Sequence, residues 1–323
     1  MKRLLSLVAA MGLSVGLVSN ALAAYPEKPV TIVVPFAAGG PTDKVARDLA
    51  EVIRKGLNNQ SVVIENVGGA GGTLGAAKVA KAAPDGYTLF MGAVHHTIAP
   101  SMYPRLDYDI EKDLVPLILV ASVPQVVVVN PRKVPVANFK EFLEFARKNP
   151  GKLNYGSAGS GTSHHLAGEL FKQQTKTFIT HIPYRGAGPS LQGLIAGDVD
   201  MMFDGLGSSA AHITGGRIKA LMMAGSKRSP AFPDVPSAAE VGLPNYNVTT
   251  WYGVWAPKGT PADAQARAIE EIRKACSTDE AKQVWARQGA EFTATTGAQF
   301  GSFINTEIKK WTEVVKVSGA TLD

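Results

Sequence analysis

Apolar segments rich in β-branched residues alternate along this chain with segments in which apolar residues recur every three or four positions. The first pattern is typical of strands buried on both faces, and the second of helices that pack one face on a sheet. Strands are expected at residues 29–36, 61–67, 87–92, 153–156, 178–183, 199–203 and 218–224. Helices are expected at residues 45–53, 73–81, 139–148, 189–196, 262–275 and 300–317, and from residue 163. This order predicts an α/β fold with mostly parallel sheets flanked by helices.

The strand–loop–helix pattern occurs in two blocks without a flexible linker between them. Two lobes joined by crossing strands are therefore expected, rather than independent domains. Residues 117–129 are the candidate for the outgoing crossing, and residues 219–225 are the candidate for the return. The predicted organisation is a first lobe made of residues 24–120 and 225–323 and a second lobe made of residues 121–224.

Residues 1–23 have the three parts of a secretory signal peptide. Lys2 and Arg3 give a positive start, residues 4–18 are apolar and uncharged, and Ala21-Leu22-Ala23 matches the small-x-small cleavage pattern. A membrane anchor is disfavoured because a span needs about 20 apolar residues. We expect the segment to be cleaved and the mature protein to be exported.

Composition excludes several classes of protein. The 323 residues are 45% hydrophobic, which excludes a disordered chain. Cys276 is the single cysteine, so the sequence has no disulfide framework within the chain and no multi-cysteine metal site. The 33 basic and 27 acidic residues are dispersed, which argues against a nucleic-acid partner. Cys276 is expected to be inert in a surface helix.

Three loops that follow predicted strands consist almost entirely of small and hydroxyl residues: 37–43, 157–162 and 204–209. Ligands of open parallel sheets bind at such loops, where backbone N–H groups can face the ligand. The first two loops lead directly into helix N-termini, which attract anions, and neither contains Lys or Arg. A carboxylate is therefore favoured over a polyphosphate, although Thr42 or Thr162 could equally cap its helix.

Enzymatic and metal-binding interpretations have weaker support. The segment GAGGTL at residues 69–74 lacks the last glycine of a dinucleotide fingerprint, and the chain has no phosphate-loop, HExxH or GxSxG motif. A serine hydrolase that uses Ser157 or Ser160 with His165 and Asp204 is the alternative function. The pairs His95-His96 and His164-His165 are not expected to bind a metal, because adjacent side chains point apart; capping or lining a cleft is expected instead. Arg185 is assigned a structural role in preference to a ligand contact.

Several motifs occur together in a fixed order. They are VVPFAAGGPTD from Val33, PDGYTL from Pro84, YGSAGSGTSHHLAGELF from Tyr155, HIPYRGAGPSL from His181, GDVDMMFD from Gly197, and WYGV from Trp251. With these motifs, the whole mature chain resembles the Bug family of extracytoplasmic solute receptors, which serve tripartite tricarboxylate transporters. The loop after Gly92, which contains His95 and His96, departs from the typical pattern.

The resemblance implies a two-lobed, type II-like periplasmic binding protein that closes on a small organic carboxylate and delivers it to a membrane permease. It implies neither enzymatic activity nor a cofactor nor a metal, and a monomer suits this mode of action. A partner in a membrane sensor, contacted only by the liganded form, is a further alternative. The carboxylate would be held by the loops at residues 36–43 and 157–162. The expected ligand-binding residues are Phe36, Ala37, Ala38, Gly39, Thr42, Asp43, Ser157, Gly159, Ser160, Thr162, His165 and Asp204.

Overall fold

The computed structural model describes residues 25–323 except residues 55, 58, 288, 321 and 323. The expected signal peptide lies outside the described residues. The strands are β1 (Val30–Val34), β2 (Val62–Asn66), β3 (Thr88–Ala93), β4 (Leu114–Val129), β5 (Asn154–Ser157), β6 (Thr180–Pro183), β7 (Met201–Gly205), β8 (Lys219–Met223), β9 (Thr249–Pro257) and β10 (Glu291–Thr296). The helices are α1 (Pro41–Ile53), the 3₁₀ turn η1 (Ala70–Gly72), α2 (Thr73–Ala80), α3 (His95–Met102), α4 (Phe139–Lys148), α5 (Ser163–Thr175), α6 (Ala187–Ala196), α7 (Leu206–Thr214), α8 (Ala262–Cys276), α9 (Asp279–Arg287) and α10 (Gly297–Ser318).

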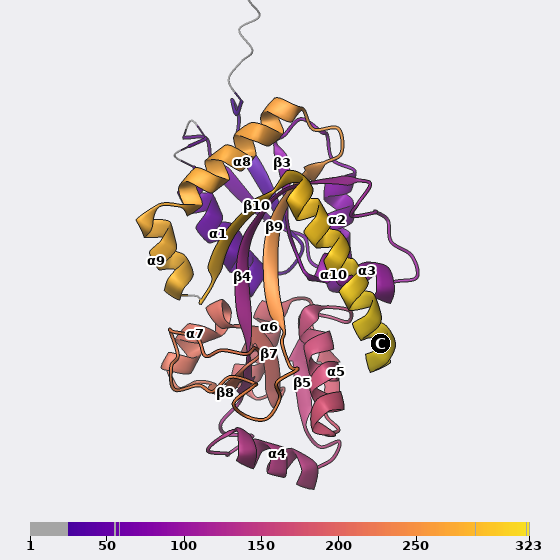
Figure 1. Ribbon diagram of the computed structural model, residues 1–323, viewed down its shortest axis with the longest axis vertical. Coiled ribbons are helices and arrows are strands. Elements are labelled where there is room, and N and C mark those ends of the chain that lie inside the picture. Colours follow the sequence, from indigo (N-terminus) through magenta and orange to yellow (C-terminus); the bar gives the residue numbers. More distant parts are fainter. Residues whose placement is uncertain (1–24, 55, 58, 288, 321, 323) are drawn as a thin grey trace, which may run out of the picture.

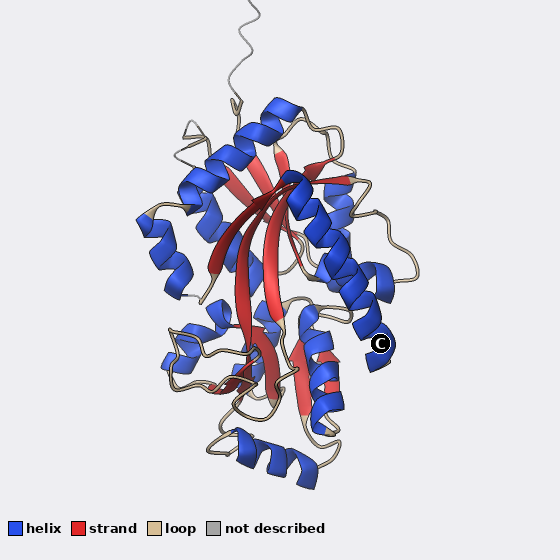
Figure 2. Cartoon of the chain, viewed as in Figure 1, coloured by secondary structure: helices blue, strands red, loops and turns tan. Residues whose placement is uncertain are grey.

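The strands form a mixed sheet that extends through both lobes in the order β2-β1-β3-β9-β4-β7-β5-β6, with β10 and β8 also paired to β4 (Figures 1 and 2). The pairs among β1, β2 and β3 and among β5, β6 and β7 are parallel, as the sequence predicts for βα units. All pairs that involve β4 or β9 are antiparallel. The parallel character is therefore confined to the outer strands of each lobe.

Strand β4 connects the two lobes. Its first part, through Pro124, pairs with β9 and β10, whereas its last part, Gln125–Val129, pairs with β7 and β8. This agrees with the outgoing crossing expected at residues 117–129. The return crossing differs from the expectation, because β8 pairs with the end of β4 in the second lobe and the chain returns later along β9. Figure 1 shows β4 and β9 side by side between the lobes.

Alternation along the strands builds a hydrophobic core on each face of the sheet. Val126 and Val128 belong to one core with helices α1, α6, α7, α8 and α9, while Val127 and Val129 belong to the other with helices α2, α3, α4, α5 and α10. Cys276 lies at the end of α8, a helix with one exposed face, and its side chain is buried on the face that packs in the first core. Burial raises the pKa of its thiol to about 12, which keeps it protonated and unreactive, as expected.

Helix α7 occupies a segment that the sequence suggested was a ligand loop. The helix begins at Leu206, so the loop expected at residues 204–209 is reduced to the end of β7. Ser208 and Ser209 both donate hydrogen bonds to Oδ2 of Asp204, each 2.6 Å long. Their hydroxyl groups are therefore used within the first turns of the helix.

Within the described part of the chain, no helix is long and apolar enough to cross a membrane.

Candidate functional site

Helices α1, α3, α5 and α6 begin around one small cavity between the lobes. Its wall consists of Phe36, Gly40, Pro41, Thr42, His95, Ala158, His164, Ala187 and Tyr252. The two helix-start loops singled out in the sequence thus meet at a shared cavity. Each helix start carries a partial positive charge and free N–H groups, so their convergence favours an anion. The cavity has about 10 Å³ of free volume, which is room for one water molecule, so the lobes are closed.

A larger apolar depression lies elsewhere on the second lobe. Its volume is about 350 Å³, and its lining comes from the end of α7, from β8 and from neighbouring loop residues such as Pro131 and Val235. Lys219 is the charged residue in this lining, and its ammonium group donates a hydrogen bond to the carbonyl oxygen of Val136 at 2.7 Å. This depression is separate from the converging helix starts, which offer the polar groups that a ligand site needs.

Asp43 fixes the shape of the first loop. Its carboxylate accepts hydrogen bonds from the Gly39 amide at 3.0 Å, from Nε of Arg47 at 2.9 Å and from Nδ2 of Asn66 at 2.9 Å. Burial alone would raise the pKa of Asp43, but these bonds outweigh it and lower the pKa. The charge of Asp43 is therefore used to hold the loop that follows Phe36.

The first loop packs directly against the start of α6 in the other lobe. A Cβ atom added at Gly188 would lie 2.5 Å from the carbonyl oxygen of Ala38, and one added at Gly40 would lie 3.1 Å from the amide nitrogen of Gly188. Such backbone approach is open to glycine and to no larger residue. Ala38 and Gly39 are exposed at this contact and Ala37 is half-buried. The closed lobes therefore depend on small residues on both sides.

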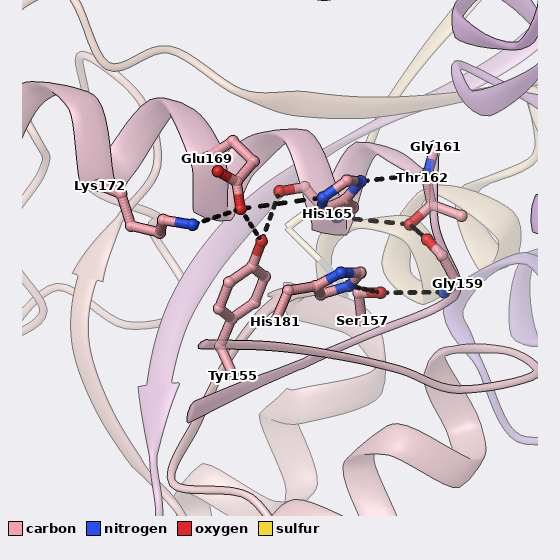
Figure 3. A network of polar contacts seen from close by, with 9 residues as sticks. All are labelled: Tyr155, Ser157, Gly159, Gly161, Thr162, His165, Glu169, Lys172 and His181. Atoms are coloured by element: carbon pink, nitrogen blue, oxygen red, sulfur yellow. Dashed lines mark hydrogen bonds and ion pairs between the residues drawn. The ribbon is translucent and has the colours of Figure 1, made fainter. Parts of the chain in front are cut away.

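The second loop is held by its own hydroxyl groups (Figure 3). Ser157 Oγ accepts a hydrogen bond from the Gly159 amide at 3.0 Å and lies 2.6 Å from Nε2 of His181. Thr162 is the N-cap of α5: its hydroxyl donates to the carbonyl of Gly159 at 2.7 Å and accepts from the amide of His165 at 3.4 Å. Both hydroxyl groups are fully buried and shape the loop behind Ala158.

His165 braces the same loop. Its Nδ1 accepts a hydrogen bond from the Gly161 amide at 3.2 Å, and its ring stacks on that of His181 with centroids 4.0 Å apart. Nε2 of His165 also lies 3.8 Å from Glu169, which accepts hydrogen bonds from Tyr155 and Lys172 (Figure 3). His165 is therefore part of the support of α5 and lies outside the wall of the cavity.

Direct hydrogen bonds between described residues join the two lobes across the cleft. Nδ1 of His95, at the start of α3, accepts from the amide of Ser163, at the start of α5, at 2.9 Å. The Tyr103 hydroxyl donates to the carbonyl of Ser160 at 2.8 Å. Both bonds join the first lobe to the second loop, so they stabilise the closed arrangement.

Several polar atoms at the cavity lack a hydrogen-bond partner. Among the described residues, none pairs with Nδ1 of His164, with the hydroxyl of Tyr252 or with Oδ1 of Asp204. His164 and Tyr252 line the cavity, and all three side chains are almost completely buried. An unpaired buried polar atom costs about 1–3 kcal/mol of stability. A molecule bound in the cavity that hydrogen-bonds to His164 or Tyr252 would remove this cost.

Burial controls the charges around the cavity. It lowers the pKa of His164 to about 4 and the pKa of His95 well below the ordinary value, so both rings are neutral at pH 7. Burial also raises the pKa of Asp204 to about 6, against the opposing bonds from Ser208 and Ser209. The pKa of Tyr252 is raised by burial and by nearby Asp204, an effect that the Thr250 hydroxyl opposes in part. Of the described residues that line the cavity, none is Lys or Arg.

The expected site residues occupy three positions relative to the cavity. Phe36 and Thr42 line it. Ala37, Ala38, Gly39, Asp43, Ser157, Gly159, Ser160, Thr162 and His165 belong to the two loops or to the start of a helix that surrounds it. Asp204 is outside the wall: it precedes Gly205, the last residue of β7, and a Cβ atom added at Gly205 would lie 3.9 Å from the Tyr252 hydroxyl.

Other wall residues were not identified from the sequence as ligand contacts: Gly40, Pro41, Ala158, Ala187 and Tyr252, with His95 and His164 expected as caps or cleft-lining residues. The first five of these residues lie in the motifs that carry the family resemblance, and this position was the signal in the sequence that could have identified them as wall residues. Arg185 is exposed, and its carbonyl lies close to Gly68.

The geometry does not assemble the alternative hydrolase triad. Ser157 pairs with His181 instead of His165, and the Asp204 carboxylate accepts from Ser208 and Ser209. Metal binding also lacks support: in residues 25–323, setting aside the positions without a description, no group of three His, Cys, Asp or Glu side chains could hold an ion.

Comparison with known proteins gives a consistent result. Residues 45–320 match the family model described as the tripartite tricarboxylate transporter family receptor. Protein BugT of Bordetella pertussis is 35% identical over 325 residues, which cover 100% of this chain and 99% of BugT.

Solved structures agree with this match. An R. palustris protein solved with adipate has a TM-score of 0.89 and 33% identity, covering 93% of this chain and 100% of its own. MatC from Rhodopseudomonas palustris, with bound malate, has a TM-score of 0.83 and 35% identity, covering 90% of this chain and 100% of MatC. The two-lobed fold is thus that of periplasmic binding proteins, and the chain is a receptor rather than an enzyme. It belongs to the tripartite tricarboxylate transporter receptor family, as the order of its motifs suggested.

Proposed function

We propose that this protein captures a small organic carboxylate between its lobes and delivers it to a permease of the tripartite tricarboxylate type. The observation that carries the proposal is the convergence of the helix starts of α1, α3, α5 and α6 on a cavity with unpaired buried polar atoms. The adipate and malate bound by similar proteins support a carboxylate ligand.

Binding would use the electrostatics of the backbone in place of a charged side chain. Charge-assisted hydrogen bonds contribute about 1.5–3 kcal/mol each, so four or five of them, less the cost of closure, reach micromolar affinity. A ligand that contacts both lobes binds the closed state better than the open state and therefore favours closure. Opening is required for entry, because the closed cavity has about 10 Å³.

The proposed ligand-binding residues are those expected from the sequence together with the wall of the cavity. Phe36 and Thr42 belong to both sets. The proposal places the first lobe boundary at residue 120, within β4, and moves the second boundary from residue 225 to β9, where the chain returns. It also removes residues 1–23 as a signal peptide and assigns the mature monomer to the periplasm. Asp43, Thr162 and His165 would act by holding the loops in shape.

Isothermal titration calorimetry of the mature protein against a panel of carboxylates tests the proposal. The panel should contain aliphatic di- and tricarboxylates, acidic amino acids and aromatic acids, with neutral sugars and organic cations as controls. Stoichiometric binding of at least one acid with an affinity near the micromolar range is expected. Binding confined to sugars or cations would refute the proposed function.

A further inference from the structure

Four loops meet where the closed lobes touch, and we call them the seam loops. They are residues 36–43 and 67–72 of the first lobe and residues 157–162 and 184–186 of the second lobe. A Cβ atom added at Gly186 would lie 3.2 Å from the amide nitrogen of Ala37, and one added at Gly71 would lie 2.7 Å from the carbonyl oxygen of Ser160. The seam loops of the two lobes are therefore in direct contact in this closed form.

Asp43 and Arg185 are the residues of the seam loops that have charged side chains. The carboxylate of Asp43 pairs with Arg47 at 2.9 Å, so its charge is balanced. Arg185 is exposed, and among the residues that the structure describes its guanidinium group has no hydrogen-bond or ion-pair partner. The structural role expected for this side chain therefore lacks a partner, and Arg185 gives the seam loops an unbalanced positive charge.

Arg185 lies close to the cavity without forming part of its wall. It is two residues before Ala187, a wall residue at the start of α6, so at most about 7 Å separates the two backbone positions. This separation is within the Debye length of about 8 Å at physiological salt. The charge of Arg185 can therefore act on a carboxylate that enters the open cleft, although none of the described wall residues is Lys or Arg.

A positive charge at this place affects the approach of an anion more than the bound state. An exposed charge attracts an anion through water and raises its association rate, whereas it adds little to the stability of a closed complex. A cation inside the cavity would instead slow the release on which delivery depends.

We infer that Arg185 is a capture residue, whose charge draws the carboxylate into the open cleft before the helix starts hold it. The inference rests on the proposed function and adds the step by which the ligand enters. Capture by Arg185 and binding by backbone groups are then separate tasks, carried out by different parts of the seam loops.

Stopped-flow fluorescence measures association and dissociation separately. The probes are malate and adipate, which similar proteins bind, or the tightest-binding acid of the calorimetric panel if neither binds. Trp251, next to the wall residue Tyr252, is the reporter. At about 20 mM salt, Arg185→Gln should lower the association rate constant by about two- to fivefold and leave the dissociation rate constant unchanged. At about 1 M salt the difference should disappear, because the Debye length falls to about 3 Å.

Two further variants separate charge from shape and position. Arg185→Lys keeps the charge and should retain the association rate constant of the wild-type protein. Lys140→Gln is the matched control, because it removes one exposed positive charge from α4, at the far end of the second lobe (Figure 1), and it should change neither rate constant. If Arg185→Gln does not fold, as judged by thermal melting, Arg185→Met takes its place as the neutral variant.

The outcomes distinguish this inference from the proposed function. An unchanged association rate constant in Arg185→Gln, or an equal loss in Arg185→Lys, overturns the inference alone. A change confined to the dissociation rate constant also overturns it, because Arg185 would then contact the bound carboxylate. Binding of no carboxylate by the wild-type protein overturns both the inference and the proposed function.

Discussion

The imidazole of His95 accepts a hydrogen bond from the backbone amide of Ser163 across the cleft, with Nδ1 and N 2.9 Å apart. The amide is one of the first in α5, a group that has no partner within its own helix. A neutral histidine of the first lobe therefore provides the hydrogen-bond acceptor for a backbone amide at the start of α5 in the second lobe. Together with the bond from Tyr103 to Ser160, this contact links closure of the lobes to the uncharged state of His95.

Removing these bonds should favour the open form of the unliganded protein. His95→Phe and Tyr103→Phe keep the aromatic rings and delete one cross-cleft hydrogen bond each. Each bond contributes about 0.5–1.5 kcal/mol, so the ratio of closed to open molecules should fall by about two- to tenfold. Small-angle X-ray scattering should show a larger radius of gyration for both variants. Tyr108→Phe is the control, because it removes a buried hydroxyl that has no partner among the described residues and lies outside the cavity wall, and it should leave the radius unchanged. An unchanged radius in both cleft variants would show that these bonds do not hold the lobes together.

Gly188→Ala tests whether close backbone approach is needed for closure. The new methyl group would meet the carbonyl of Ala38 at 2.5 Å, and overpacking of this kind costs about 1–3 kcal/mol. Carboxylate affinity should fall by about tenfold or more, because the closed state is selectively destabilised. Gly301→Ala in α10 is the control, since its Cβ would meet only Pro116 at 3.9 Å. Equal affinities of the two variants, measured by calorimetry, would argue against this contact.

Thr162→Ala should destabilise the protein through loss of the α5 cap. The expected decrease in the free energy of unfolding is about 0.5–2 kcal/mol, measured by urea denaturation. Thr162→Ser retains the hydroxyl that bonds to Gly159 and His165 and should preserve most of the stability. Carboxylate binding should weaken in Thr162→Ala because the loop loses its internal bond. A serine variant as unstable as the alanine variant would assign the effect to the methyl group.

Stability should decrease as the pH falls from about 6.5 to 4. His95, His96 and His164 have lowered pKa values, about 4 for the last two, because burial disfavours their charged forms. The unfolded chain binds these protons at about pH 6.5, so unfolding is favoured progressively below that pH, by about 1.4 kcal/mol per histidine and pH unit. Asp204 opposes the trend, because its raised pKa of about 6 lets the folded protein take up a proton first.

Urea denaturation at several pH values measures this slope. His164→Asn should reduce the dependence of the free energy of unfolding on pH by the contribution of about one proton. Lys140→Gln, the control substitution at an exposed residue, should leave this dependence unchanged. A stability that stays constant between pH 6.5 and 4 in the wild-type protein would contradict the assignment of these histidines as buried and neutral.

Elements with strong local signals were predictable from the sequence. Helix α4 matches residues 139–148 at both ends, since Asn138 caps its start by accepting from the amide of Glu141 and basic residues occupy its last turn. Most of β4 was also apparent as the outgoing crossing expected at residues 117–129, because its long, mainly apolar stretch reflects burial on both faces, although Pro116 and Pro124 interrupt it.

Elements held by tertiary contacts were missed. Helix α3 has Pro100 within it and little hydrophobic periodicity, and His95 at its start is positioned by the opposite lobe. Strand β9 was noted only as a motif around Trp251 and Tyr252, although it is the return crossing. The loops at the cavity were apparent from their small residues, whereas the contribution of Tyr252 depends on strand pairing over long sequence distances. Which residues contact a ligand stays a prediction.

The most direct test is a crystal structure of the protein with the carboxylate that binds most tightly in the calorimetric panel. We expect the carboxylate to lie between the loops that follow β1 and β5 and to accept hydrogen bonds from backbone amides of both lobes. A carboxylate bound to one lobe alone, or at a position away from the starts of α1 and α5, would contradict this expectation.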